Sequence, residues 1–177
     1  MNVLILGIGN VLLSDEGLGV KVVEDILARY LLPEEVTVVD GGTMGLDLLS
    51  YLDGRTHMFI VDAIRSEREP GAVVRLELDD PPAYFHAKIS PHQLGLSELL
   101  AVASLSGNLP GKIILFGGVP KDLSTGLELS AEAGGCVPRL SGLIVDELKA
   151  LGLPVEEMSR ERTAVSEWPG APGRPGS

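Results

Sequence analysis

Cysteine, aromatic residues and positive charge are all scarce in this 177-residue sequence. The single cysteine, Cys136, excludes an internal disulfide framework and a cage of thiolates around a metal ion. The 14 lysines and arginines are outnumbered by 25 acidic residues, which gives a net charge of −11. This balance argues against duplex nucleic acid and against an anionic membrane surface as partners.

Long apolar runs and a basic leader are missing as well. No stretch reaches the ~18 apolar residues of a membrane span. The first apolar run is broken by Gly7 and Gly9, and no basic segment precedes it as one would in a signal peptide. We therefore predict a cytoplasmic protein with no membrane partner. The length and the 45% hydrophobic content predict one domain with a full core.

Segments with the periodicity of strands alternate with segments of helical periodicity. Apolar runs predict strands over residues 3–6, 36–40, 57–63, 72–78 and 112–116, and helical spacing predicts helices over 17–31, 46–52 and 91–106 and from 130 onwards. In the second helix, Leu46, Leu49 and Leu52 are expected to face inward. The fourth strand follows a connection too short for a parallel crossover, which needs about a dozen residues. It is therefore expected to pair antiparallel at an edge.

The predicted fold is α/β: a single three-layer domain with a mostly parallel five-stranded sheet, one antiparallel edge strand and helices on both faces. The domain is expected to span residues 1–153. Residues 154–177 are rich in proline and glycine, which predicts a disordered tail. Residues 79–90 are expected to be an irregular connection that returns to the carboxyl edge of the parallel strands. The helix that begins at Pro91 then starts at that edge.

This topology brings three reactive side chains to one edge of the sheet. Glu16 follows the first strand, Asp62 ends the third, and His92 lies in the first turn of a helix. A carboxylate that ends an apolar strand needs solvent, a hydrogen bond or a cation, and a helix N-terminus keeps an imidazole neutral and able to bind metal. Two carboxylates and one imidazole suit divalent Ni, Zn, Mn or Fe. The neighbouring Asp15 is expected to cap the helix, with Ser14 as the other candidate.

The turn after the first strand matches a dinucleotide-binding loop only in part. The G-x-G-x-x-G fingerprint requires a third glycine where Leu12 stands, and acidic residues follow where a pyrophosphate would sit. We therefore expect no nucleotide cofactor. A peptidyl-tRNA hydrolase also opens with a strand and a G-x-G-N turn, but the acidic charge and the absence of histidine before His57 disfavour it.

Six segments, taken in order, resemble the hydrogenase maturation endopeptidases: GIGNVLLSDEGLG, GGTMG, VDA, SPHQLGL, GGVP and GLELS. That family removes a C-terminal extension from the nickel-loaded precursor of the [NiFe] hydrogenase large subunit. The resemblance implies the family's mixed five-stranded fold, this precursor as partner, and nickel supplied by the precursor. The family's metal-binding residues fall on Glu16, Asp62 and His92.

For this reaction we expect Glu16 and Asp62 to be the catalytic carboxylates, and two mechanisms stay open. In one, the metal polarises the scissile carbonyl or activates water, and one carboxylate is the general base. In the other, the paired carboxylates share a proton and activate water themselves. The backbone amides of Gly41, Gly42 and Thr43 are candidates to hold the extension. The alternative function is a non-catalytic chaperone or metal sensor that binds the nickel precursor without cutting it.

Overall fold

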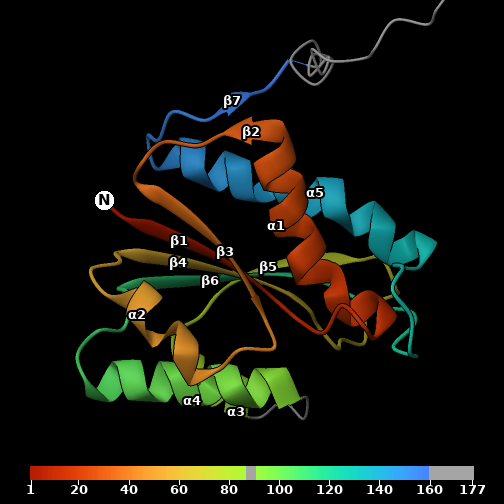
Figure 1. Cartoon of the computed structure of the whole chain (residues 1–177), viewed down its shortest axis with the longest axis horizontal. Helices are drawn as coiled ribbons and strands as arrows, with labels where there is room; N and C mark the ends of the chain where they lie inside the picture. Colours follow the sequence, from red (N-terminus) through yellow and green to blue (C-terminus); the bar gives the residue numbers. More distant parts are fainter. Residues whose placement is uncertain (87–90, 160–177) are drawn as a thin grey trace, which may run out of the picture.

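The fold is that of a computed structural model, which describes residues 1–86 and 91–159 and, for Pro91 and His92, the backbone alone. A central five-stranded sheet has the strand order β3-β1-β4-β6-β5 (Figure 1). Its strands are β1 (Val3–Ile8), β3 (Val36–Gly42), β4 (His57–Ala63), β5 (Val73–Glu77) and β6 (Lys112–Gly118). The α-helices are α1 (Leu18–Arg29), α2 (Leu49–Leu52), α3 (Pro81–His86), α4 (Pro91–Leu105) and α5 (Ala131–Ala150).

The sheet has the predicted strand directions. β1 pairs in parallel with β3 and with β4, and β4 pairs in parallel with β6. β5 pairs antiparallel with β6 at the edge of the sheet, as the short connection before it predicts. Three of the parallel strands, β1, β3 and β6, run two residues further at their carboxyl ends than predicted, because glycine-containing ends there still join the ladder of hydrogen bonds.

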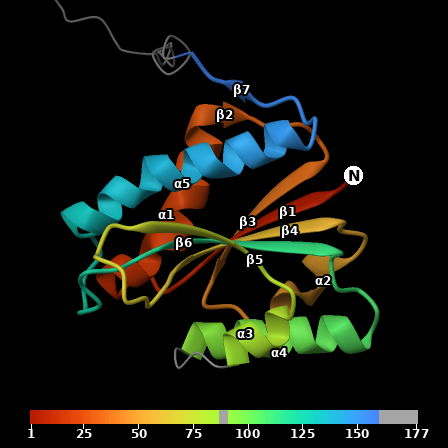
Figure 2. The same cartoon turned by 180° about the vertical axis from the view of Figure 1, so that it is seen from behind.

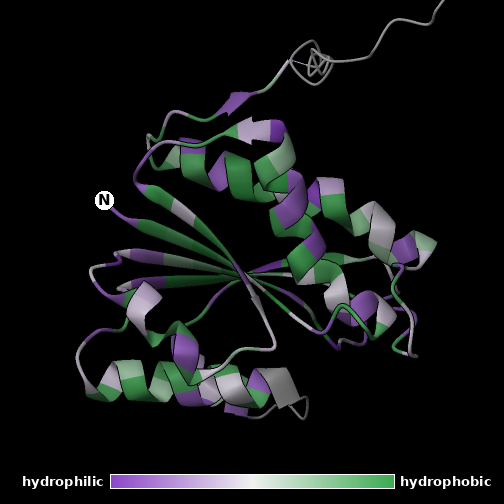
Figure 3. Cartoon of the chain, viewed as in Figure 1, coloured by the Kyte–Doolittle hydropathy of each residue, from purple (hydrophilic) through white to green (hydrophobic). Residues whose placement is uncertain are grey.

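Helices cover both faces of the sheet (Figure 2), and the core lies in two layers, one on each face. Alternate residues of β1 belong to opposite layers. Val3 and Ile5 pack with α1 and α5, whereas Leu4 and Leu6 pack with α2, α3 and α4. Strands β1, β4 and β6, at the centre of the sheet, are mostly hydrophobic, and α1 shows both apolar and polar residues (Figure 3). This is the pattern expected of parallel strands covered on both sides. The three-layer prediction is confirmed.

Two predicted details of the second layer are wrong. Residues 79–90 were expected to be irregular, but α3 occupies part of this connection, because its apolar side chains, Phe85 above all, are buried against α4. In the segment after β3, a 3-10 helix η2 (Leu46–Leu48) precedes α2. Leu48 and Leu52 are buried there and Leu46 is exposed, since the tighter 3-10 turn shifts the buried face.

The folded chain continues beyond the predicted boundary at Leu153. Val155 is buried in the layer of α1 and α5. Strand β7 (Glu156–Glu157) then pairs antiparallel with β2 (Tyr30–Leu31), the short strand that follows α1. The predicted tail therefore starts too early, and residues 160–177 lie outside the described residues. Across residues 1–86 and 91–159, every helix is too short or too polar to serve as a membrane span.

Candidate functional site

The carboxyl ends of β1 and β4 form the switch point of the sheet. From β1 the chain crosses to β3 on one side, and β4 lies on the other side of β1. In open α/β sheets, ligands bind in the crevice outside the strand ends at such a point. The segment after β1 contains a 3-10 helix, η1 (Ser14–Gly17), with Glu16 in it, and Asp62 is the penultimate residue of β4.

Two glycines allow the chain to place η1 against β4. Gly9 has a φ of 131°, and a β-carbon there would overlap the carbonyl oxygen of Glu16. A β-carbon on Gly19, in the first turn of α1, would overlap the carbonyl oxygen of Val61. Both close approaches require glycine. The first holds η1 against the end of β1, the second holds α1 against β4, and η1 also contacts β4, the strand that carries Asp62. The side chain of Glu16 is half-buried.

Asp62 is fully buried, and a side chain of α4 holds its carboxylate. The Nε2 of Gln93 donates a hydrogen bond of 2.8 Å to the Oδ2 of Asp62. The charge of this carboxylate also affects Tyr84 of α3. Burial is the main reason that the pKa of the Tyr84 hydroxyl is raised, and the charge of Asp62 is the second. Helices α3 and α4 therefore both reach the carboxyl end of β4, as the topological prediction for α4 requires.

His92 is the second residue of α4 and precedes Gln93. Consecutive Cα atoms are about 3.8 Å apart, so the hydrogen bond from Gln93 brings the backbone of His92 to the same edge of the sheet. The side chain of His92 lies outside the described residues, as does Ser90, the predicted cap of this helix. Among the side chains that are described, no group of three His, Cys, Asp or Glu could hold a metal ion.

Gln93 was missed as a site residue. In the sequence, the segment Ser90-Pro91-His92-Gln93 is typical of a helix start, with the glutamine three residues after the serine as a capping-box partner. The structure uses its amide nitrogen for a different bond, to a carboxylate 31 residues earlier in the chain. The only local signal would have been an amide side chain directly after a candidate metal ligand.

The predicted capping role of Asp15 and Ser14 is wrong. The N-cap of α1 is Gly17, and no side chain caps the helix there. Instead, the buried carboxylate of Asp15 accepts hydrogen bonds from the N–H groups of Lys121, Asp122 and Ser130 and from the Ser130 hydroxyl, at 2.7–2.9 Å. The Ser14 hydroxyl donates to the carbonyl of Ser124. Both side chains fasten the loop before α5 to the segment after β1.

These hydrogen bonds decide the ionisation of Asp15. Burial acts to raise its pKa, but the hydrogen bonds from the backbone of Asp122, Ser130 and Lys121, together with the Ser130 hydroxyl, outweigh burial and lower it. Asp15 is therefore a buried anion whose acceptor sites are occupied by the fold. It does not belong to the candidate site, although it is adjacent to Glu16 in the chain.

The predicted substrate loop borders a pocket beside η1. This pocket of about 310 Å³ is lined by Gly9, Asn10, Val11, Leu12, Val20, Asp40, Gly42 and Thr43. Gly41 is buried behind it, and Gly42 has a φ of 48°. The N–H of Gly42 donates to the Oδ1 of Asp40, and its carbonyl accepts from the N–H of Gly9. The Gly42 amide, one of the predicted substrate donors, is thus already engaged within the protein.

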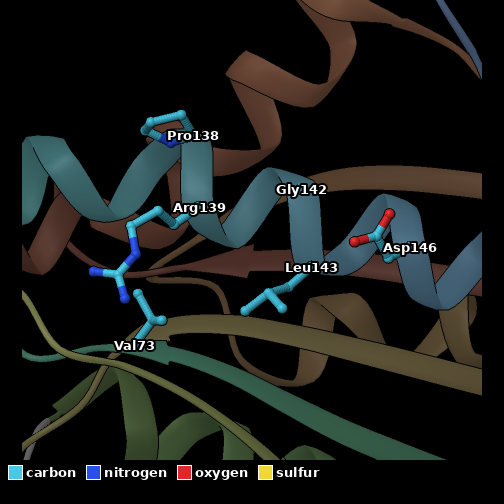
Figure 4. Close-up of a pocket in the computed structure, with 6 residues that line it drawn as sticks. All are labelled: Val73, Pro138, Arg139, Gly142, Leu143 and Asp146. Atoms are coloured by element: carbon cyan, nitrogen blue, oxygen red, sulfur yellow. The ribbon is translucent and has the colours of Figure 1, made fainter.

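A second pocket, of about 350 Å³, lies between α5 and β5 (Figure 4). Val73, Pro138 and Leu143 form its apolar lining, and the guanidinium of Arg139 donates to the carbonyl of Gly71. Asp146 lies further along α5 (Figure 4). Helix α5 covers the face of the sheet opposite α4, so this pocket is separate from the junction of Asp62 and Gln93.

Comparison with known proteins gives consistent results. Residues 20–147 match the family model described as "Hydrogenase maturation protease". The hydrogenase 2 maturation protease of Escherichia coli K12 is 39% identical over 162 residues, which cover 91% of this chain and 98% of that protein. The HupD hydrogenase expression/formation protein of Rhizobium leguminosarum bv. viciae is 38% identical, over 86% of this chain and 77% of its own length.

Solved structures show the same similarity in three dimensions. The hydrogenase maturating endopeptidase HybD from E. coli superposes with a TM-score of 0.85 at 36% identity, covering 92% of this chain and 99% of that one. The [NiFe] hydrogenase maturation protease HybD from Thermococcus kodakarensis superposes with a TM-score of 0.70 at 29% identity, covering 83% of this chain and 99% of its own. The five-stranded α/β fold is therefore shared over nearly the full length of both structures.

Proposed function

Because the chain belongs to the hydrogenase maturation protease family and is a peptidase, we propose that it cuts the precursor of a [NiFe] hydrogenase large subunit. The bond cleaved joins the mature subunit to its C-terminal extension, and the precursor already carries nickel when it is cut. The proposed location is the cytoplasm.

In this proposal, Glu16, Asp62 and His92 complete the coordination of nickel that the precursor brings. The observation that carries it is the hydrogen bond from Gln93 to Asp62, because it joins the first turn of α4 to the end of β4, beside η1. Two oxygen ligands and one imidazole nitrogen are a suitable donor set for nickel, with positions left for the ligands of the precursor. Nickel is then part of the substrate, and its presence signals that insertion is complete.

The proposed reaction is the addition of water to the scissile carbonyl, followed by cleavage of the C–N bond. Nickel polarises the carbonyl as a Lewis acid, and a carboxylate takes the proton from water and passes it to the leaving amine. Glu16 is better suited to this transfer than Asp62, since it is half-buried and within reach of solvent, whereas Asp62 is enclosed. The pocket beside Gly42 and Thr43 is proposed to hold a side chain of the extension against Val11 and Leu12.

The test is to incubate the purified protein with nickel-loaded precursor and to measure the mass of the large subunit. We expect a loss of mass equal to the extension, and no cleavage once a chelator has removed nickel from both proteins. Cleavage that persists without nickel would exclude the role of the metal and leave the mechanism of paired carboxylates. An unchanged mass with stable complex formation would instead identify a non-catalytic binder.

Substitution of the carboxylates tests their assignment. Glu16→Gln and Asp62→Asn are each expected to lower the cleavage rate by about 10²–10⁴-fold, the usual contribution of a general acid or base. Glu69→Gln is a matched control, because Glu69 is an exposed acid of the loop that follows β4. His92→Ala should also abolish processing and leave the fold intact. Retained activity in any of the three would remove that residue from the proposed site.

A further inference from the structure

The bond between Gln93 and Asp62 is a buried contact between two different elements. Gln93 is 8% exposed and Asp62 is 0% exposed, and the donor and acceptor atoms are 2.8 Å apart. A hydrogen bond with an ionised partner is stronger than a neutral one, and a buried carboxylate requires such a donor. The contact therefore contributes to more than the packing of α4 on the sheet.

The chemistry of an amide makes this contact directional. The Nε2 of glutamine only donates, so it requires Asp62 to accept at Oδ2. This fixes the rotation of the carboxylate about its last bond. The same side chain also sets the separation between β4 and the start of α4, because His92 is its immediate neighbour in the chain. This bond thus acts on the orientation of one candidate ligand and on the backbone position of another.

We propose that Gln93 is the positioning residue of the metal-reading site: it orients the Asp62 carboxylate toward the nickel of the substrate and holds the first turn of α4 in register with β4. This inference rests on the proposed function and adds a residue to its site. Partners of this kind, which hydrogen-bond a metal ligand, change metal affinity by about 10–100-fold when they are substituted.

The experiment compares five proteins: wild type, Gln93→Met, Gln93→Asn, Ser97→Ala and Asp62→Asn. Methionine keeps the size of glutamine and removes the donor, whereas asparagine keeps the amide on a shorter arm. Ser97 is the matched control, since it lies one turn further along α4, is 5% exposed and donates to the carbonyl of Pro82 rather than to Asp62. Two quantities are measured: the affinity for Ni²⁺ alone, by titration calorimetry, and the rate of cleavage of nickel-loaded precursor.

Gln93→Met is expected to weaken Ni²⁺ binding by about 10–100-fold and to slow cleavage in the same range. Gln93→Asn should fall between it and wild type, and Ser97→Ala should match wild type in both measurements. Two results would overturn the inference. In one, the Ni²⁺ affinity and cleavage rate of Gln93→Met lie within about twofold of wild type. In the other, Ser97→Ala loses as much Ni²⁺ affinity and cleavage rate as Gln93→Met. Failure of the proposed function gives another result: Asp62→Asn would then cleave the precursor and bind Ni²⁺ as wild type does.

Discussion

Two buried carboxylates at the same edge of the sheet are held in different ways. Asp15 receives three backbone N–H groups and one hydroxyl, all from residues 121–130. Asp62 receives the side-chain amide of Gln93, which projects from the first turn of α4. Three of the four donors to Asp15 belong to the main chain, whereas the bond from Gln93 to Asp62 depends on the identity of one side chain.

This difference separates a structural acid from a candidate functional one. Backbone donors surround Asp15 whatever side chains the loop carries, so this carboxylate fastens residues 121–130 to the segment after β1. The loop is also joined there by a β-bridge between Leu13 and Gly126. Asp62, by contrast, lies near Tyr84 and near the first turn of α4, whose second residue is His92. Both carboxylates are buried, so burial does not separate them, whereas the source of the hydrogen bonds named above differs.

The largest expected effect on stability is that of Asp15→Asn. Asparagine keeps one acceptor oxygen, and its NH2 group would face either the N–H of Ser130 or the N–H groups of Lys121 and Asp122, so at least one buried donor would lose its acceptor. We expect the free energy of unfolding to fall by about 3 kcal/mol, measured by urea denaturation. The exposed Asp47→Asn is the control and should change it by less than about 0.5 kcal/mol. A loss below about 1 kcal/mol at Asp15 would mean that the loop is held by other contacts, and the comparison with Asp62 would lose its basis.

A second, smaller effect is expected in acid. The folded state keeps the pKa of Asp15 below the ordinary value of an aspartate, so the unfolded chain takes up this proton first as the pH falls. The contribution of Asp15 to stability is then present above about pH 4 and is lost as the pH falls through the lowered pKa. Urea denaturation at about pH 5, 4 and 3 should show the gap between wild type and Asp15→Asn shrinking with acidity. A gap that stays constant would contradict the lowered pKa.

Most of the fold could be predicted because its signals are local. Continuous apolar runs mark strands covered on both faces, and the short connection before β5 leaves no room for a parallel crossover. What could not be predicted depends on packing. Helix α3 forms where Phe85 can be buried, and β7 continues the fold beyond Leu153 because β2 offers it an edge. Neither partner is visible from the local sequence.

In the candidate site, too, local signals could be predicted and long-range contacts could not. The positions of Glu16, Asp62 and the first turn of α4 follow from strand ends and connection lengths, which the sequence reveals. The hydrogen bonds of Asp15 and Asp62 do not follow from these signals. The donors to Asp15 lie 106 to 115 residues further along the chain, and acids in a first helical turn usually interact with the helix dipole. The assignment of Asp15 as a helix cap was therefore reasonable from local sequence and wrong in three dimensions.

The smallest expected effect concerns two serines of the same helical segment. The Ser130 hydroxyl donates to Asp15 and accepts from the N–H of Ala133 at the N-cap of α5. Ser141, within α5, is fully buried, and its hydroxyl has no hydrogen-bond partner among the described residues. Ser130→Ala should therefore lower the free energy of unfolding by about 1–2 kcal/mol, as the loss of a helix cap does.

Ser141→Ala should act in the opposite direction and raise the free energy of unfolding by up to about 1 kcal/mol. The substitution removes a buried polar atom that has no partner, and alanine is the better helix former. Urea denaturation of both variants and of wild type measures whether each substitution raises or lowers the free energy of unfolding. If Ser141→Ala destabilised the protein as Ser130→Ala does, its hydroxyl would have to be satisfied in solution, by a buried water for example. The rule drawn from Asp15 and Asp62 would then have to count water among the donors and acceptors that give a buried polar group its role.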